Sequence, residues 1–120
     1  MKEKLALFCD VDADAVIQNM TASTIYEVPL MMQKEGLDKI VLEKLEMDYR
    51  PAHMEEWERM VHRIKNPANK VKIAVVGKYV ELPDAYISVT EALHHAGIYN
   101  STDVKIKWVN AEEIEKKALI

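Results

Sequence analysis

The stretch KIAVVGKYVELPDAYISVTEAL, Lys72–Leu93, contains three structural signals in succession. An apolar run rich in valine and isoleucine ends at Gly77, which is typical of a buried β-strand. A turn with the sequence Leu-Pro-Asp follows, and Asp84 is a suitable N-cap for the helical pattern that comes next. Gly97 is placed to end that helix. The stretch therefore predicts a strand, a loop and a helix of an α/β protein.

A second strand and a further helix are predicted after this one. Residues 103–110 alternate apolar residues with lysines, which favours a half-exposed strand near a sheet edge. The sequence AEEIEKKALI then begins another helix. This order predicts a right-handed βαβ unit with a parallel sheet. Because only 27 residues follow Leu93, the pattern starts an α/β domain that these residues are too few to complete.

The beginning of the chain has its own α/β pattern. Residues 4–9, KLALFC, form a compact apolar run that predicts a buried strand. Ligands usually lie at the carboxyl end of such strands. Asp10, Asp12 and Asp14 follow, and turn formation explains this acidic trio better than a cation site, because a calcium loop's glycine and distant glutamate are missing. A short helical turn capped by Asp12 or Asp14 is expected next.

Helices are predicted between the two strand-containing ends. Pro29 is a suitable first-turn residue for one helix, and residues 37–47 carry the apolar stripe of a second. Residues 48–53 are interpreted as a linker. The segment MEEWERMVHRIKN predicts a third helix, with acidic residues in its first turn and basic residues in its last. The turn-forming segment NPANK, residues 66–70, is the strongest internal boundary.

Composition excludes several classes of protein. The 120 residues are 49% hydrophobic and 30% charged, an ordinary globular mixture. A net charge of −4 gives no basic excess for nucleic acid. A single cysteine excludes an intrachain disulfide and favours the cytoplasm. No apolar run is long enough for a membrane span, and the short run before the acidic trio is interpreted as a strand rather than an export signal.

Few residues by themselves indicate chemistry. Three glycines cannot form a P-loop or a dinucleotide-binding loop. Cys9 has no neighbouring histidine and is interpreted as a buried, unreactive thiol of the first strand. The adjacent His94 and His95 point about 100° apart on a helix and are expected at the surface. Lys4, taken alone, is expected to be solvated. The residues alone thus predict a soluble α/β protein without a complete active site.

Four segments, in order, resemble the CTP synthase family. They are KLALFCDVDADAVIQ, IYEVPLMMQKEGLD, EEWERMVHRIKNP and KIAVVGKYVELPDAYISVTEALHHAG. The resemblance runs from Lys4 to about Asn110, and the last segment is the most specific, since its length and unusual composition make a chance match improbable.

The resemblance implies a chain that spans a domain junction. Residues 1–47 would be the C-terminal part of a P-loop-type synthetase (amidoligase) domain. Residues 48–70 would be a helical interdomain linker. Residues 71–120 would be the first βαβ unit of a class I glutamine amidotransferase domain, which is flavodoxin-like. The chain is then expected to be a fragment of a longer enzyme.

Five positions match nucleotide-contact positions of the family. Lys4 matches the lysine that contacts the substrate UTP and the inhibitor CTP, and Phe8 falls on the same segment. Met20, Thr21 and Ala22 fall where the family's chain passes the ATP adenine, mostly through backbone groups. Many members have an acidic residue and a valine where this chain has a threonine and an alanine, which puts side-chain contacts there in doubt.

A sixth and a seventh position are implied at the domain junction. Lys78 and Tyr79 follow the first glutaminase strand and match a turn that the family places near the synthetase domain. A plain strand-to-helix loop explains them equally well. The resemblance implies no catalytic residue in this chain, because the phosphate loop, the magnesium carboxylates and the glutaminase nucleophile match no stretch of it. Cys9 is not that nucleophile.

The family's activity is the ATP-dependent amination of UTP to CTP, a step of pyrimidine nucleotide biosynthesis. Glutamine supplies the ammonia, Mg²⁺ and ATP are required, CTP inhibits by feedback, and the enzyme is a homotetramer. These properties are expected of the parent enzyme, with no nucleic-acid or membrane partner. The chain alone is expected to be inactive.

Two other interpretations stay open. The chain could be a non-catalytic interaction module that docks on nucleotide-synthesis enzyme subunits through open strand edges. It could also be a nonfunctional remnant. Two partial domains would have small, partly exposed cores, so an oligomeric, aggregating or loosely folded product is expected on expression alone.

Overall fold

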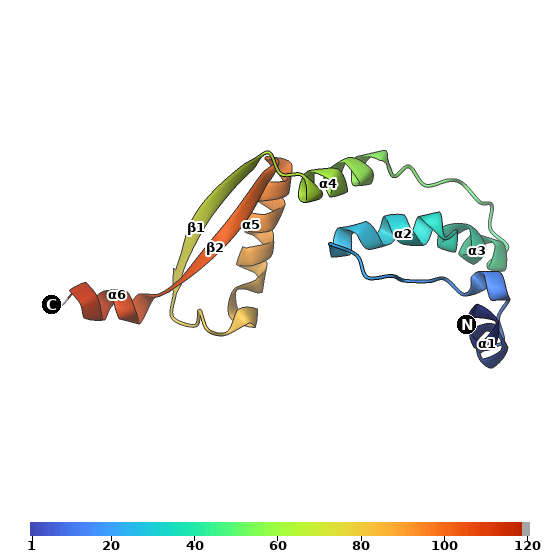
Figure 1. Cartoon of the computed structure of the whole chain (residues 1–120), viewed down its shortest axis with the longest axis horizontal. Helices are drawn as coiled ribbons and strands as arrows, with labels where there is room; N and C mark the ends of the chain where they lie inside the picture. Colours follow the sequence, from blue (N-terminus) through green and yellow to red (C-terminus); the bar gives the residue numbers. More distant parts are fainter. Residues whose placement is uncertain (119–120) are drawn as a thin grey trace. The chain divides into compact units, whose positions relative to one another are not determined.

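The computed structural model of the chain describes residues 1–118, which form a mixed α/β structure in two compact units (Figure 1). The first unit is Met1–Val61 and the second begins at His62. The division falls inside helix α4 (Glu55–Lys65), which was predicted from its apolar stripe and its charge order. Because helices occur together with a parallel pair of strands, the α/β class is confirmed.

The first unit is entirely helical among its regular elements. It contains α1 (Lys2–Cys9), the 3₁₀ turns η1 (Ala13–Ala15) and η2 (Ile25–Glu27), α2 (Val28–Lys34), α3 (Leu37–Lys44) and the first half of α4. Pro29 lies in the first turn of α2, as predicted. The predicted helix over residues 37–47 is present but ends at Lys44. Residues 47–54 have no regular structure.

The strand predicted over residues 4–9 is wrong. These residues lie in α1, and only Ala6 is buried, while Phe8 is 77% exposed. A strand needs a neighbour for its backbone hydrogen bonds, and no strand occurs within residues 1–61. A helix instead satisfies its backbone groups within the segment. Cys9 is consequently exposed, so its prediction as a buried thiol is also wrong.

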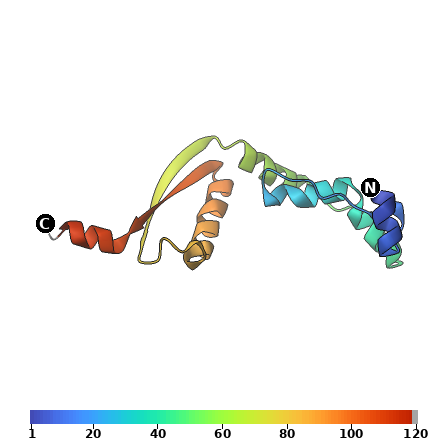
Figure 2. The ribbon, with the colours of Figure 1, turned by 60° about the horizontal axis from the view of Figure 1, so that its bottom comes forward.

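The second unit contains the predicted βαβ arrangement. Strand β1 (Asn69–Gly77) pairs in parallel with β2 (Thr102–Asn110), from Asn69 opposite Thr102 to Gly77 opposite Asn110. The 3₁₀ turn η3 (Pro83–Tyr86) and helix α5 (Ile87–Tyr99) connect them, and α6 (Ala111–Ala118) follows. Figure 2 shows α5 running along one face of the strand pair. The strand prediction for β1 is confirmed, but the strand is not buried: its first four residues are exposed, and from Ile73 onward half-buried and exposed residues alternate.

Gly97 does not end its helix, which corrects the prediction. Helix α5 continues through Gly97 to Tyr99, and Gly97 is buried. A Cβ atom on Gly97 would lie 2.6 Å from the carbonyl oxygen of Thr102 and 2.7 Å from Cγ2 of Val104. The glycine is therefore required because α5 approaches β2 closely, and not because the chain needs a left-handed cap.

Asp84 is not the N-cap of α5, which is a second correction in this region. Asp84 lies inside η3, whose flanking residue is Leu82, and α5 starts three residues later, at Ile87. The proline at the start of η3 has the fixed φ of a helical first turn, so the helical turn begins at Pro83, two residues before the start that a cap at Asp84 indicates.

Little of the apolar surface is buried. Ala6 and Val61 are the buried hydrophobic residues among those described, at 7% and 5% exposure. Large side chains such as Leu7, Ile25 and Tyr99 are more than three-quarters exposed. This agrees with the expectation of small, partly exposed cores.

Candidate functional site

Lys4 and Phe8, the predicted UTP and CTP contacts, lie one helical turn apart on α1. Their i, i+4 spacing puts them on the same side of the helix. Both side chains are exposed. The helix is held by other side chains: Lys2 Nζ donates to Glu35 Oε2 at 3.3 Å, and Ala6 is buried. This arrangement leaves a cation and an aromatic ring together and accessible to a ligand.

Met20, Thr21 and Ala22, the predicted ATP contacts, lie in an irregular segment between η1 and η2. Within the described residues, their backbone N–H and C=O groups take part in no backbone hydrogen bond. Backbone donors and acceptors without such partners are available to a ligand or to solvent. No hydrogen bond or ion pair of the described residues joins this segment to Lys4 or Phe8, so the structure does not bring the two predicted contact sets into one site.

Asp12, predicted as a cap, forms an ion pair instead. Its Oδ2 accepts from Lys44 Nζ, which ties the turn after α1 to the end of α3. Asp12 precedes η1 but makes no side-chain cap hydrogen bond. The hydrogen bond and charge of Lys44 lower the pKa of Asp12, and Asp12 in turn raises the pKa of Lys44. Asp12 therefore joins segments that are distant in the sequence and does not form the cap hydrogen bond predicted for it.

The structure contains an apolar groove of about 560 Å³ that the sequence analysis did not predict. It lies between α2, α3 and the irregular segment before α4. Its apolar lining includes Val28, Met32, Leu37, Val41, Leu42 and Met54. The stripe over residues 37–47 was the available signal, but a stripe alone does not tell a filled contact from an open groove.

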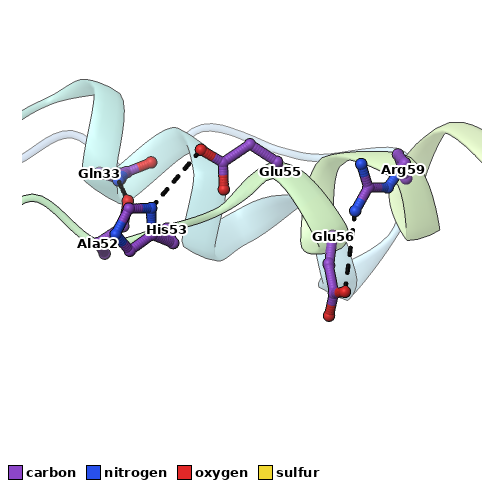
Figure 3. A network of polar contacts seen from close by, with 6 residues as sticks. All are labelled: Gln33, Ala52, His53, Glu55, Glu56 and Arg59. Atoms are coloured by element: carbon purple, nitrogen blue, oxygen red, sulfur yellow. Dashed lines mark hydrogen bonds and ion pairs between the residues drawn. The ribbon is translucent and has the colours of Figure 1, made fainter.

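Polar contacts border the groove and the start of α4 (Figure 3). Gln33 Nε2 donates to the carbonyl oxygen of Ala52 at 3.3 Å, which holds the irregular segment to α2. His53 Nδ1 lies 3.8 Å from Glu55 Oε1, and Arg59 lies 3.8 Å from Glu56 Oε1. The glutamate side chains are 68% and 94% exposed, so both carboxylates face solvent.

Asp38, which lines the groove, forms a hydrogen bond with Tyr49. The Tyr49 hydroxyl donates to Asp38 Oδ2 at 3.4 Å. Partial desolvation, followed by the Asp38 charge and this hydrogen bond, raises the pKa of Tyr49. The phenol therefore stays protonated and acts as a hydrogen-bond donor throughout the neutral range.

Lys78 and Tyr79, the predicted interdomain residues, lie in the turn after β1. Both are exposed, Tyr79 by 64%, and the Tyr79 carbonyl accepts from Leu82 N at 3.0 Å. At the carboxyl end of β1, the Tyr86 ring packs on Trp108 with centroids 5.7 Å apart. The turn is thus held at its base while its two predicted contact residues are accessible.

The histidines are at the surface, as predicted. His94 Nδ1 and His95 Nε2 lie 3.8 and 3.9 Å from the two carboxylate oxygens of Glu91 on α5. Among residues 1–118, no three histidine, cysteine, aspartate or glutamate side chains are grouped to hold a metal ion. No helix in the described part of the chain has both the length and the apolar character to cross a bilayer.

Residues 1–47 match the family model described as CTP synthase N-terminus. The chain is 61% identical over 115 residues to CTP synthase of Desulfitobacterium hafniense (strain Y51), which is 96% of the chain and 22% of that protein. The predicted resemblance to CTP synthase is confirmed. CTP synthase of Moorella thermoacetica is 55% identical over 99% of the chain, and CTP synthase of Methanocaldococcus jannaschii is 55% identical over 98% of it.

The chain spans about a fifth of the length of these curated CTP synthases, 22% in each of the three. The match to CTP synthase extends through both compact units, since it covers at least 96% of the chain. The similarity therefore includes the helical residues 1–61 and the βαβ unit together.

Proposed function

We propose that this chain forms the junction segment of a CTP synthase, an ATP-dependent ligase that aminates UTP to CTP with glutamine or ammonia as nitrogen source. In this proposal residues 1–47 form the end of the amidoligase domain and residues 71–120 form the beginning of the flavodoxin-like glutaminase domain. Residues 48–70 connect the two domains. The single observation that carries it is the identity of 55–61% to CTP synthases over nearly the whole chain. The cytoplasm stays the predicted compartment, given one cysteine.

Lys4 is the residue with the clearest role in this proposal. A triphosphate carries several negative charges, and an exposed lysine supplies a compact positive charge with three donors. Phe8, one turn away, offers a ring against which a pyrimidine base can stack. Lys4 would thus bind the triphosphate of UTP, or of the inhibitor CTP, and Phe8 would help to orient the base.

Residues 20–22 are proposed to hold the adenine of ATP through their backbone. Backbone recognition explains why Thr21 and Ala22 can differ from the residues of many family members without loss of the contact. The side chains of Met20 and Thr21 are exposed and would border the base. A substitution that keeps the backbone is then expected to change ATP affinity little.

Magnesium is not assigned to this chain. The described residues contain no cluster of carboxylates fit to hold the ion, so none of them is given the role of a metal ligand. In such enzymes Mg²⁺ would offset the negative charge of the phosphate groups. Lys78 and Tyr79 are proposed to contact the synthetase domain across the interdomain turn, and the homotetramer is proposed by resemblance alone.

A chimera tests the proposal most directly. The matching segment of Desulfitobacterium hafniense CTP synthase is replaced by this chain, and CTP formation from UTP, ATP and glutamine is measured. The chimera is expected to keep turnover within about tenfold of the parent, because substitutions between close relatives conserve volume and pattern. A folded, tetrameric chimera without CTP formation would overturn the proposal.

Within the chimera, Lys4→Ala is expected to raise the KM for UTP and to weaken CTP inhibition together. The KM for UTP is expected to rise by about tenfold or more, because a charge-assisted contact to phosphate contributes roughly 1.5–3 kcal/mol. Lys2→Ala is the matched control, because Lys2 lies on the same helix but pairs with Glu35. An equal effect of both substitutions would contradict the assignment of Lys4.

The isolated chain is expected to make no CTP and to hydrolyse no glutamine, since no stretch of it matches the family's catalytic motifs. CTP formation by the purified 120-residue chain would contradict this expectation.

The second candidate is a non-catalytic module that docks on CTP synthase subunits. The observation that favours it is the amount of exposed apolar surface, with Leu7, Phe8 and Tyr99 each at least 77% exposed. Co-purification of the isolated chain with a full-length CTP synthase, at a defined stoichiometry, would support this role. Failure of the two to bind at micromolar concentration would exclude it.

A further inference from the structure

Trp57 of α4 contacts the chain just after residues 20–22, the ATP segment of the proposed function. Its indole nitrogen donates to the carbonyl oxygen of Tyr26 at 2.6 Å. The two rings lie 6.3 Å apart at an angle of 48°, which makes them a tilted aromatic pair. Tyr26 follows Ala22 by four residues, so this contact fixes a point close to the end of the ATP segment.

The apolar stripe of α4 explains the position of Trp57 only in part. Trp57 lies one turn before the buried Val61 and is itself half-buried. Burial of a ring favours contact with any apolar neighbour. A hydrogen bond to one backbone carbonyl is directional, so it also fixes where the chain at Tyr26 runs relative to α4.

Hydrogen bonds within residues 23–27 extend this restraint toward the ATP segment. The backbone N–H and the hydroxyl of Ser23 both donate to Glu27 Oε2, at 3.4 and 3.1 Å. Thr24 Oγ1 accepts from the N–H of Tyr26 at 3.4 Å and so caps η2. These bonds close the five residues into a turn, and the indole nitrogen is bonded to that turn.

The ATP segment has no regular structure of its own. Residues 20–22 lie in neither a helix nor a strand, and Met20 and Thr21 are exposed. The conformation of such a segment depends on what holds its ends. Recognition through backbone groups requires those groups in one arrangement. The turn that begins directly after Ala22 is therefore in the right place to set that arrangement.

We propose that Trp57 is a positioning residue for ATP, which holds the turn of residues 23–27 and thereby keeps the ATP segment in the arrangement that binds adenine. The role needs no contact between Trp57 and the nucleotide. It rests on the proposed function, which assigns residues 20–22 to the adenine. It goes further by giving a residue of the proposed linker a part in nucleotide binding.

The size of the effect follows from the population of the binding arrangement. The apparent dissociation constant of a ligand is its intrinsic value divided by the fraction of protein in the binding arrangement. A hydrogen bond of ordinary net strength changes such a fraction by about threefold to tenfold. Loss of the Trp57 donor is therefore expected to weaken ATP binding by that factor, without a comparable effect on UTP.

Steady-state kinetics of the CTP synthase chimera that carries this chain test the proposal. Ammonia is the nitrogen source, so that glutamine hydrolysis is not needed. Trp57→Phe keeps an aromatic ring and removes the donor. The KM for ATP is expected to rise by about threefold to tenfold, while the KM for UTP stays within about twofold. An unchanged KM for ATP, or an equal rise in both KM values, would overturn the proposal.

These readouts do not depend on how much of the variant folds. A smaller fraction of folded enzyme lowers the maximal rate but changes neither KM. The inhibition constant of a non-hydrolysable ATP analogue is expected to rise by the same factor as the KM for ATP, because it reports affinity without turnover. An inhibition constant that stays unchanged would count against a role in ATP binding.

Trp108→Phe is the matched control, since it makes the same substitution on β2. It is expected to leave the KM for ATP within about twofold of that of the unmodified chimera. If Trp108→Phe raises the KM for ATP as much as Trp57→Phe does, the effect is not specific to the turn and the assigned role is wrong.

A second pair of variants tests the turn itself. Glu27→Ala removes the acceptor of both Ser23 hydrogen bonds and is expected to raise the KM for ATP by about threefold or more. Glu27→Gln retains a carbonyl oxygen as acceptor and is expected to restore most of the affinity. Equal KM values for ATP in these two variants would contradict positioning through the turn.

The unmodified chimera separates this inference from the proposed function. If the chimera is folded and tetrameric but forms no CTP, the proposed function fails and the positioning role fails with it. If the chimera forms CTP and Trp57→Phe leaves the KM for ATP unchanged, the proposed function stands and the positioning role alone is wrong.

Discussion

The hydroxyl of Tyr86 occupies the space in which a side chain at Gly77 would begin. A Cβ atom on Gly77 would lie 2.1 Å from Tyr86 Oη and 2.7 Å from Tyr86 Cζ. Tyr86 is in turn packed on Trp108, with an angle of 42° between the rings. The three residues join the end of β1, the start of α5 and β2, so they hold together the carboxyl end of the strand pair.

Gly77→Ala is expected to destabilise the second unit by about 1 kcal/mol or more, because Tyr86 must leave Trp108 and a tilted aromatic pair contributes roughly 0.5–1.5 kcal/mol. Urea unfolding followed by tryptophan fluorescence measures the change. In a Tyr86→Ala background the same substitution is expected to have almost no effect, because the clashing atoms are gone. Equal destabilisation in both backgrounds would contradict the contact.

Gly97→Ala is expected to lower the free energy of unfolding. Alanine in a helix is favoured over glycine by about 1 kcal/mol, but the new Cβ would lie 2.6 Å from a backbone oxygen that has little freedom to move. Overpacking of this kind costs about 1–3 kcal/mol, so we expect net destabilisation. Ala92→Ser, at an exposed position of the same helix, is the control and is expected to change stability by less than about 0.5 kcal/mol.

The Asp12–Lys44 pair predicts a pH dependence of stability. The pKa of Asp12 is lowered from its ordinary value of 3.8, so the pair stabilises the fold above about pH 4, and that contribution disappears as pH falls through the lowered pKa. The pKa of Lys44 is raised from 10.5, so the contribution is also lost as pH rises beyond that value. The free energy of unfolding of the unmodified chain and of the Asp12→Asn variant, measured between about pH 2 and 7, tests this pH dependence. Parallel curves for the two proteins would contradict the pair.

Trp57 connects α4 to the preceding helices through its indole nitrogen. Trp57 Nε1 donates to the carbonyl oxygen of Tyr26 at 2.6 Å, and the two rings lie 6.3 Å apart. Trp57→Phe keeps an aromatic ring but removes the donor, so the free energy of unfolding is expected to fall by about 0.5–1.5 kcal/mol. Trp108→Phe is the comparison, because the indole nitrogen of Trp108 takes part in no such bond among the described residues and a smaller loss is expected. A larger loss at Trp108 would contradict this account.

Cys9 provides a direct test of the α1 helix. Its side chain is exposed, so a thiol reagent is expected to modify it in the native chain at a rate within about tenfold of the rate in denaturant. A buried strand thiol would react orders of magnitude more slowly. Slow labelling that becomes fast on unfolding would therefore show that residues 4–9 are buried, contrary to the structure.

Local signals predicted the elements whose hydrogen bonds and capping are local. The stripe with Trp57 and its charge order predicted α4, Pro29 predicted the start of α2, and the alternation of residues 103–110 predicted β2. The parallel pairing of β1 with β2 followed from their order along the chain. The helix at residues 4–9 was missed because a short apolar run has no period that separates a buried strand from a helix.

The amino-acid sequence by itself determined the resemblance to CTP synthase and the α/β class, because both depend on the order and spacing of residues along one chain. The tertiary structure alone decided why Gly97 is glycine, which face of the strand pair collects lysines, and that an open apolar groove lies between α2 and α3. These features arise between segments that are separated along the sequence. Register and close approach depend on how such segments pack, and no local preference of the backbone specifies them.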